Sequence, residues 1–192
     1  MVWCYINDFI RAICYKKEMN KFLLFLPIVF IIIISAFLLI FLLQNKDPNK
    51  PPTALLHENL PNFKLNNLFR ENKTLSTKDL NKKVVIINFF ASWCTPCKTE
   101  HPLFFDIKKK YPNIFILGIN MQDNNVDAIK FLNEDGNPYD YVGVDKNGFI
   151  GVEFGVVGLP ETFLVDKFGK IIYKYLGPLT KEIVQNEIQP LL

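Results

Sequence analysis

The stretch VVIINFFASWCTPC, residues 84–97, decides the expected fold. It joins the apolar run Val84–Phe90 to Cys94 and Cys97, which are separated by two residues. A run that is apolar almost throughout is typical of a strand covered on both faces in a parallel sheet. A helix is expected over Thr95–Lys110. The sequence therefore predicts a buried strand, a short turn and a cysteine pair at the start of a helix.

This placement of the two cysteines indicates redox chemistry. A thiol attacks a disulfide as the thiolate, and the unpaired N–H groups and positive dipole end at a helix start stabilise that anion. Cys94 and Cys97 are therefore predicted to form a dithiol/disulfide exchange centre. Cys94, nearer the helix start and expected to be the more exposed, would attack a substrate disulfide, and Cys97 would resolve the mixed disulfide.

Other uses of a cysteine pair fit the sequence less well. A structural zinc site needs four ligands, and no second pair at ligand spacing is found among Cys4, Cys14, His57 and His101. Covalent haem attachment requires CxxCH, but Lys98 follows Cys97. A permanent structural disulfide stays open, although it would close a very small loop and constrain little of the unfolded chain. Redox chemistry is favoured, with no metal and no cofactor expected.

The elements around the cysteine pair are predicted from residue spacing and turn residues. Their order gives an α/β fold, a mixed sheet with helices on both faces and a thioredoxin-type topology. Strands are expected between Leu60 and Leu80 and over Val84–Phe90, Ile114–Ile119, Tyr141–Val144, Thr162–Val165 and Lys170–Leu176. Helical spacing relates Val126, Ile129 and Leu132, and a last helix from Thr180 is expected to bury Leu179, Ile183, Ile188 and Leu191 or Leu192.

A long apolar segment precedes this domain. Phe22–Leu43 carries no charge and would be about 33 Å long as a helix, enough for a hydrocarbon core about 30 Å thick. Its apolar core exceeds the roughly 7–15 residues of a signal peptide, and no small-residue cleavage site follows before Gln44. We therefore predict an uncleaved transmembrane helix over residues 22–43.

The flanks of this segment predict its orientation. The basic residues before it are Arg11, Lys16, Lys17 and Lys21, whereas only Lys46 and Lys50 follow closely. This bias places residues 1–21 in the cytoplasm and the body of the protein outside it. Met19 stands directly before the apolar run like a normal start, so we expect residues 1–18, with Cys4 and Cys14, to be a mis-assigned start.

The remaining chain is expected to be a linker and one domain. Three prolines between Gln44 and Thr53 predict an extended linker over residues 44–56, ahead of a thioredoxin-like domain over residues 57–192. The hydrophobic content of 49% is high, and its excess lies in the apolar segment. The net charge of the whole chain is only +3, which gives no sign of a nucleic-acid partner.

Three motifs in order identify a family resemblance. They are ASWC at residues 91–94, the segment from GIN at 118–120 through GNPY at 136–139, and GVVGLPETFLVD at 155–166. Together they closely resemble the membrane-anchored thiol:disulfide interchange proteins of cytochrome c maturation, the CcmG/DsbE type. The similarity runs from about Leu60 to the C-terminus. It implies a thioredoxin-like fold and protein-disulfide reductase activity.

The resemblance also implies which residues support the dithiol. Pro160 should be cis and lie against it, leaving the preceding backbone free to pair with an extended substrate. Glu100 and Glu161 match the acidic groups of the family's site, and a carboxylate near Cys94 would raise the pKa of its thiol. The residues beside the cysteines, Trp93, Thr95 and Pro96, complete the expected site.

The implied substrate is the CxxCH disulfide of apocytochrome c, or a mixed disulfide with another maturation protein. Electrons would come from a membrane thiol reductant of the DsbD or CcdA type. The implied location is the bacterial inner membrane, with a single pass and the C-terminal domain in the periplasm.

Some positions depart from the family pattern. Phe90 stands where Trp is common, Thr95-Pro96 replaces Pro-Thr, and Met121-Gln122-Asp123 replaces Tyr-Lys-Asp. The residues between the cysteines tune the reduction potential, so the family's potential is not carried over. The alternatives are a general TlpA- or ResA-like periplasmic reductase and a non-catalytic binding module of the cytochrome c assembly complex. A peroxiredoxin is suggested by LPNF at residues 60–63, but its Thr-x-x-Cys motif is absent.

Overall fold

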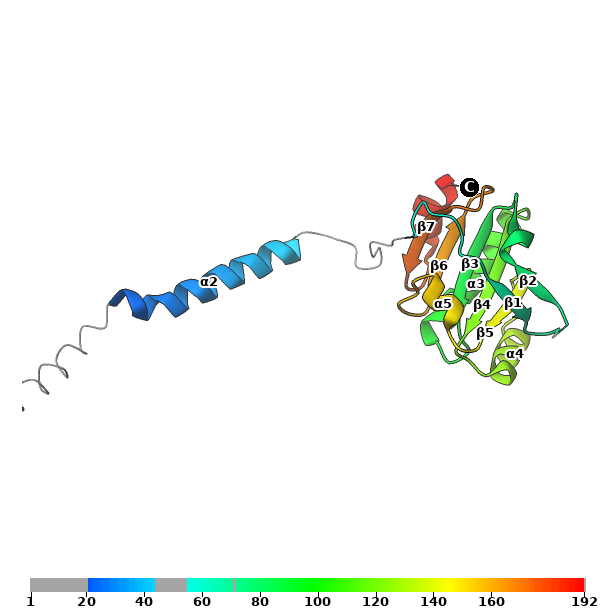
Figure 1. Cartoon of the computed structure of the whole chain (residues 1–192), viewed down its shortest axis with the longest axis horizontal. Helices are drawn as coiled ribbons and strands as arrows, with labels where there is room; N and C mark the ends of the chain where they lie inside the picture. Colours follow the sequence, from blue (N-terminus) through cyan, green and yellow to red (C-terminus); the bar gives the residue numbers. More distant parts are fainter. Residues whose placement is uncertain (1–20, 44–54, 71, 192) are drawn as a thin grey trace, which may run out of the picture. The chain divides into compact units, whose positions relative to one another are not determined.

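The computed structural model describes residues 21–43, 55–70 and 72–191 (Figure 1). The chain divides into two units, Met1–Lys46 and Asp47–Leu192. The predictions for residues 1–18, including Cys4 and Cys14, and for most of the linker at 44–56 fall outside the described residues.

In the described part of the first unit, Lys21–Leu43 forms helix α2. Its side chains are described over residues 25–40, and they are all exposed. Within the described part of the chain, no helix is both long and apolar enough to cross a membrane. The transmembrane helix predicted over residues 22–43 therefore stays a prediction.

The second unit is built on a seven-stranded mixed sheet. Its strands are β1 (Lys64–Asn67), β2 (Thr74–Ser76), β3 (Val85–Phe90), β4 (Phe115–Met121), β5 (Tyr141–Asp145), β6 (Glu161–Val165) and β7 (Ile171–Leu176). They lie in the order β2-β1-β5-β4-β3-β6-β7. Strands β3, β4 and β5 run parallel, whereas β6 pairs antiparallel with β3, and β1 with β5. The predicted α/β mixed sheet is confirmed.

Helices cover both faces of the sheet (Figure 1). The helical segments are η1 (Thr77–Leu80), α3 (Thr95–Lys110), α4 (Asn125–Glu134), α5 (Phe149–Glu153), α6 (Lys181–Ile183), η2 (Val184–Ile188) and η3 (Gln189–Leu191). One core cluster joins the sheet to α3, α4 and η2, and the other joins it to α5 and the segment before β1. The sheet therefore lies between two apolar layers.

Strand β3 shows why its sequence is apolar almost throughout. Successive side chains of a strand point to opposite faces. Ile86 and Phe90 enter the cluster under α3, whereas Ile87 and Phe89 enter the other. All six residues of β3 are buried, as predicted. The one polar residue, Asn88, points to the α3 side, where it contacts Glu100.

The last helical segments bury only part of the predicted set. Leu179 and Ile188 are buried, whereas Ile183 is half-buried. Of the alternatives Leu191 and Leu192, Leu191 is 44% exposed, because Ile188 and Val184 take the buried positions one and two turns earlier, and Leu192 lies outside the described residues. Of the residues at helical spacing in α4, Leu132 is buried and Val126 is 72% exposed in the first turn.

Candidate active site

The two cysteines lie where β3 leads into α3. Cys94 is the N-cap of α3, with extended backbone angles, and Pro96 follows in the first turn, where its missing N–H costs no helical hydrogen bond. Cys94 and Cys97 form a disulfide with an S–S distance of 2.00 Å. The Cys97 N–H donates to the Cys94 Sγ at 3.2 Å. A helix-start amide is thus already directed at the sulfur that would carry thiolate charge.

The prediction that Cys94 is the more exposed cysteine is wrong for this oxidised form. Both cysteines are 3% exposed. The Cys94 Sγ is bonded to Cys97 and accepts its N–H, so it lies over the first turn of α3 instead of projecting into solvent. The exposed groups at the site are its neighbours: Trp93 is 62% exposed, and Thr95 and Pro96 are also exposed.

Pro160 lies at the same end of the sheet as the disulfide. The Leu159–Pro160 peptide bond is cis, as the family resemblance predicts. Glu161, the next residue, begins β6 and pairs with Phe89 near the end of β3, four residues before Trp93. The turn before β6 and the turn after β3 therefore adjoin.

Glu100 is buried in a polar network on the α3 side of the sheet. It is 1% exposed. Its Oε1 accepts from the Asn88 Nδ2 at 2.8 Å, and its Oε2 accepts from the Leu179 N–H at 2.7 Å. The Tyr139 hydroxyl donates to the Asn88 Oδ1 at 2.9 Å, and Asn88 also donates to the Thr162 hydroxyl at 3.1 Å. The network joins α3, β3, β6 and the segment before α6.

Burial changes the protonation of this network. It raises the pKa of Glu100 to about 7, although the hydrogen bonds from Leu179 and Asn88 act in the opposite direction. It also raises the pKa of Tyr139 well above its ordinary value, with a further contribution from the charge of Glu100. Glu100 follows Cys97 by three residues on α3, which places the two side chains on the same helix face. A carboxyl group that exchanges a proton near neutral pH thus lies one turn from Cys97.

Glu161 has a different environment from the one expected of an open acidic group. It is 0% exposed and forms an ion pair with Lys174, which is 6% exposed, at 2.5 Å. Its Oε2 accepts the Val157 N–H at 3.0 Å, and the Lys174 Nζ donates to the Gly155 carbonyl at 2.8 Å. The charge of Glu161 is therefore largely balanced by Lys174, and the pair fixes the turn that precedes Pro160.

Asp123 is a site residue that the sequence reasoning did not single out. Its carboxylate accepts from the Ser92 N–H and hydroxyl, at 2.5 and 2.8 Å. It also accepts from the Asn120 Nδ2 and the Asn124 N–H, both at 2.8 Å. Trp93 adds a bond from its Nε1 to the Gln122 carbonyl at 3.2 Å. The turn after β4 therefore holds the residues directly before Cys94.

His101 and Asn88 were also missed. His101 is 2% exposed, its Nε2 lies 2.9 Å from the Gly136 carbonyl, and its ring packs on Phe131 with a centroid distance of 4.7 Å. Burial lowers the pKa of His101. Asn88 did carry a signal in the sequence, because it is the single polar residue inside the apolar run of β3. A buried polar residue in such a run needs a partner, and Glu100 is that partner here.

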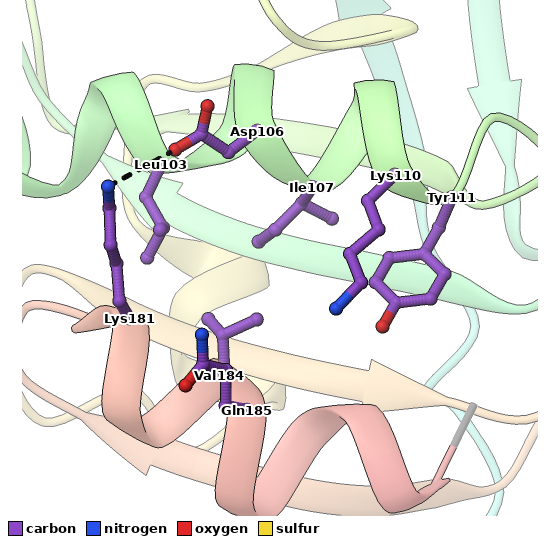
Figure 2. A pocket seen from close by; sticks show the side chains of 8 residues that line it. All are labelled: Leu103, Asp106, Ile107, Lys110, Tyr111, Lys181, Val184 and Gln185. Atoms are coloured by element: carbon purple, nitrogen blue, oxygen red, sulfur yellow. Dashed lines mark ion pairs between the residues drawn. The ribbon is translucent and has the colours of Figure 1, made fainter.

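Two hollows lie on the α3 side of the domain. One, of about 360 Å³, adjoins Trp93 and is bordered by Asp123, Asp127, Glu134, Asp135, Lys98 and Lys130 together with Ser92 and Phe131. The other, of about 220 Å³, lies between the second half of α3 and the last helical segments (Figure 2). There the Lys181 Nζ reaches the Asp106 carboxylate at 3.8 Å, and Leu103, Ile107 and Val184 face one another. The first hollow borders Ser92 and Trp93, the residues directly before Cys94.

The arrangement suits disulfide exchange. The sulfurs lie at a helix start, a buried carboxyl group with a pKa of about 7 follows one turn later, and a turn with a cis proline lies at the same end of the sheet. Among the described residues, no group of three or more His, Cys, Asp or Glu side chains is placed to hold a metal ion.

Comparisons with known proteins agree with this chemistry. Residues 56–189 match the family described as Redoxin. The thiol:disulfide interchange protein HelX of Rhodobacter capsulatus is 38% identical over 91% of this chain and 97% of its own length. The thiol:disulfide interchange protein DsbE of Tatumella citrea is 38% identical over 90% of this chain and 95% of its own length. The thioredoxin domain of a thiol-disulfide oxidoreductase from Bacteroides vulgatus superposes with a TM-score of 0.62 at 21% identity, covering 72% of this chain and 99% of that domain, which shows a thioredoxin-like fold.

Proposed function

Because this chain belongs to the Redoxin family, as a DsbE-type thiol:disulfide interchange protein, we propose that it reduces the CxxCH disulfide of apocytochrome c before haem attachment. The chain is a thiol:disulfide oxidoreductase. The observation that carries the more specific proposal is the Cys94–Cys97 disulfide at the start of α3, with Glu100 one turn away. Haem attaches only to reduced cysteines, so the reaction supplies the substrate of ligation.

The proposed reaction is a two-step exchange. The Cys94 thiolate attacks one sulfur of the substrate disulfide, which forms a mixed disulfide and releases one substrate thiolate. Cys97 then attacks the Cys94 sulfur, which releases the second substrate thiol and leaves the Cys94–Cys97 disulfide. Two electrons and two protons pass to the substrate. The helix-start N–H groups stabilise the attacking thiolate of Cys94.

We assign supporting roles to the neighbouring residues. Glu100 exchanges the proton of Cys97, since its pKa of about 7 lets it take up and release a proton near neutral pH. Trp93, Thr95 and Pro96 form the exposed surface against which the substrate backbone lies, and the buried Pro160 shapes the turn beside it. Glu161 acts indirectly, because its ion pair with Lys174 fixes the turn before Pro160.

We also propose that the protein is anchored in the bacterial inner membrane. The support is the uncharged segment Phe22–Leu43 and the exposure of its described apolar side chains along α2. An apolar surface of that extent is unfavourable in water. The basic residues before the segment favour a cytoplasmic N-terminus and a periplasmic domain. A membrane thiol reductant of the DsbD or CcdA type would then return electrons to the dithiol.

Covalent trapping tests the proposed order of attack. In Cys97→Ala, the mixed disulfide on Cys94 has no resolving thiol, so the chain should accumulate disulfide-linked complexes with apocytochrome c or its maturation partners. Cys94→Ala should accumulate none. Non-reducing gels with identification of the linked protein by mass spectrometry give the readout, and equal trapping by both variants would refute the assignment.

The trapped proteins also separate this function from its alternatives. A complex enriched in CxxCH-containing chains supports the cytochrome c role. A broad set of unrelated periplasmic proteins would indicate a general reductase instead. Full cytochrome c maturation in a strain that carries only Cys94→Ser would indicate a non-catalytic module.

A further inference from the structure

Four lysines line a hollow at the end of the sheet opposite to the disulfide. The hollow has a volume of about 500 Å³, and Lys82, Lys83, Lys110 and Lys167 line it with no carboxylate among its lining residues. The lysines come from the loop before β3, the end of α3 and the β6–β7 turn. These three loops meet at one end of the sheet, because the first residue of β3 pairs with the first of β4 and the last of β6. Cys94 follows the other end of β3.

Among the described residues these lysines form no close ion pair, although Lys83 interacts at longer range with the Asp79 carboxylate. All four are exposed. Lys110 donates to the Gln189 Oε1 at 2.9 Å, a neutral partner. The acid of the β6–β7 turn, Asp166, accepts the backbone N–H groups of Phe168 and Lys170 at 2.8 and 2.9 Å and so holds the turn.

An exposed aromatic side chain lies beside the lysines. Phe168 is 76% exposed in the β6–β7 turn, and the Lys167 Nζ lies 5.2 Å from its ring centroid. A phenylalanine that is open to water in a tight turn contributes little to the core of its own domain. Basic residues next to an exposed aromatic side chain are the combination that binds membrane interfaces, where the cations meet anionic headgroups and the ring enters the acyl boundary.

The start of the domain lies along the same turn. The Leu60 N–H donates to the Gly169 carbonyl at 2.8 Å, and the His57 N–H donates to the Ile171 carbonyl at 2.7 Å. With the proposed anchor in a bilayer, the linker of residues 44–54 keeps the domain within about 40 Å of the lipid surface, since an extended chain spans at most about 3.6 Å per residue. The lysine-lined end is therefore within reach of the lipid surface.

We propose that this end, the basic face of Lys82, Lys83, Lys110, Lys167 and Phe168, docks on the anionic phospholipid headgroups of the bilayer that holds α2. The inference rests on the proposed membrane anchor. Phe168 enters the interface and the lysines contact the phosphates, which turns the disulfide away from the lipid.

The charge at the other end of the domain supports this orientation. Four carboxylates and two lysines border the hollow beside Trp93. An anionic surface repels that end and attracts the basic face, and both effects are strongest within about 8 Å at physiological ionic strength. The reductase site would then stay open to proteins arriving from solution.

Tryptophan fluorescence in the full chain tests the docking. Phe168→Trp and the matched control Phe149→Trp, at a side chain that is 70% exposed on α5, are reconstituted in phosphatidylcholine vesicles with brominated acyl chains, with or without phosphatidylglycerol. The parent chain is measured as the reference for the emission of the native tryptophans. With phosphatidylglycerol present, Phe168→Trp should be quenched about twofold more than Phe149→Trp. The difference should vanish in about 1 M salt, where the Debye length falls to about 3 Å, and in the variant that also carries Lys82→Gln, Lys83→Gln and Lys167→Gln.

Each outcome decides the proposal. Equal quenching at both positions in anionic vesicles overturns the proposal and would indicate that the lysines bind an acidic protein partner instead. Quenching of Phe168→Trp that does not change with salt or with the lysine substitutions overturns the electrostatic basis of the docking. Flotation with neutral vesicles tests the membrane anchor separately. A chain that floats but shows no quenching difference supports the anchor and contradicts the docking. A chain that does not float contradicts the anchor.

Discussion

Glu100 is the residue through which the site responds to pH. Burial raises its pKa to about 7 in the folded protein, compared with an ordinary value of 4.5. The folded state therefore binds this proton more tightly than the unfolded chain does. The stability that Glu100 contributes is fully present below pH 4.5 and is lost as the pH rises through about 7.

We expect Glu100→Gln to remove this dependence. Relative to the parent, the free energy of unfolding of the oxidised variant should rise by about 3 kcal/mol between pH 4.5 and 7, because one pKa unit corresponds to about 1.4 kcal/mol. Urea unfolding across this pH range measures the difference. His101, whose pKa burial lowers, changes stability in the opposite direction, but it is present in both proteins and cancels. A constant difference would contradict the prediction.

Asp123 holds the approach to the disulfide, and its removal should show this. Asp123→Ala leaves the Ser92 N–H and hydroxyl and the Asn120 amide without their acceptor. We expect a loss of about 2 kcal/mol in the free energy of unfolding, typical of hydrogen bonds to a charged group. The rate of disulfide reduction should also fall, because Ser92 is two residues from Cys94. Asp127→Ala, at an exposed carboxylate of the same hollow, is the control: it should leave the rate unchanged and cost at most about 0.3–1 kcal/mol, because Asp127 lies in the first turn of α4.

At the scale of elements, the central strand and the helix after it were predictable from the sequence. The apolar run places β3 in the core because both of its faces are covered, and α3 has the predicted bounds, Thr95–Lys110. The order of the later strands followed from turn residues such as Gly169, whose φ of +81° a glycine adopts easily.

The polar network between elements was not predictable in the same way. Glu100, Asn88 and Leu179 are far apart in the sequence, and their contacts depend on how α3 and the segment before α6 pack on β3. The resemblance named Glu100 and Glu161 as site residues, yet it did not give the partner of either one. Lys174 lies in β7 with no local pattern that marks it as the partner of Glu161. Spacing rules describe one element at a time, so such pairings stay hidden.

The packing of β4 on the α3 side of the sheet can be tested with a glycine substitution. A Cβ added to Gly118 would meet the Tyr139 ring at 2.9 Å and the Phe90 ring at 3.0 Å. These two rings stack at a centroid distance of 5.1 Å, so Gly118→Ala should push them apart and cost about 1–3 kcal/mol in the free energy of unfolding. Gly158→Ala is the control, since its Cβ meets only Leu176 at 3.6 Å. Equal thermal stability of both variants would contradict this packing.

At the scale of the whole molecule, the chain combines a dithiol with the proposed anchor and a basic face. The dithiol lies at one end of the domain and the lysines at the other. In the proposed arrangement, the anchor supplies proximity to the bilayer, the basic face sets orientation, and the disulfide faces client proteins. The disulfide exchange and the orientation of the domain are tested by separate experiments, so failure of one does not decide the other.

The central claim is that the Cys94–Cys97 pair reduces a CxxCH disulfide. The most direct measurement mixes the fully reduced full-length chain with an oxidised CxxCH peptide and follows both thiol states by mass spectrometry after rapid alkylation. We expect one peptide disulfide to be reduced for each Cys94–Cys97 disulfide formed, and Cys94→Ser to leave the peptide oxidised. A peptide that stays oxidised in the presence of the reduced parent chain, or that is reduced equally by Cys94→Ser, would contradict this claim.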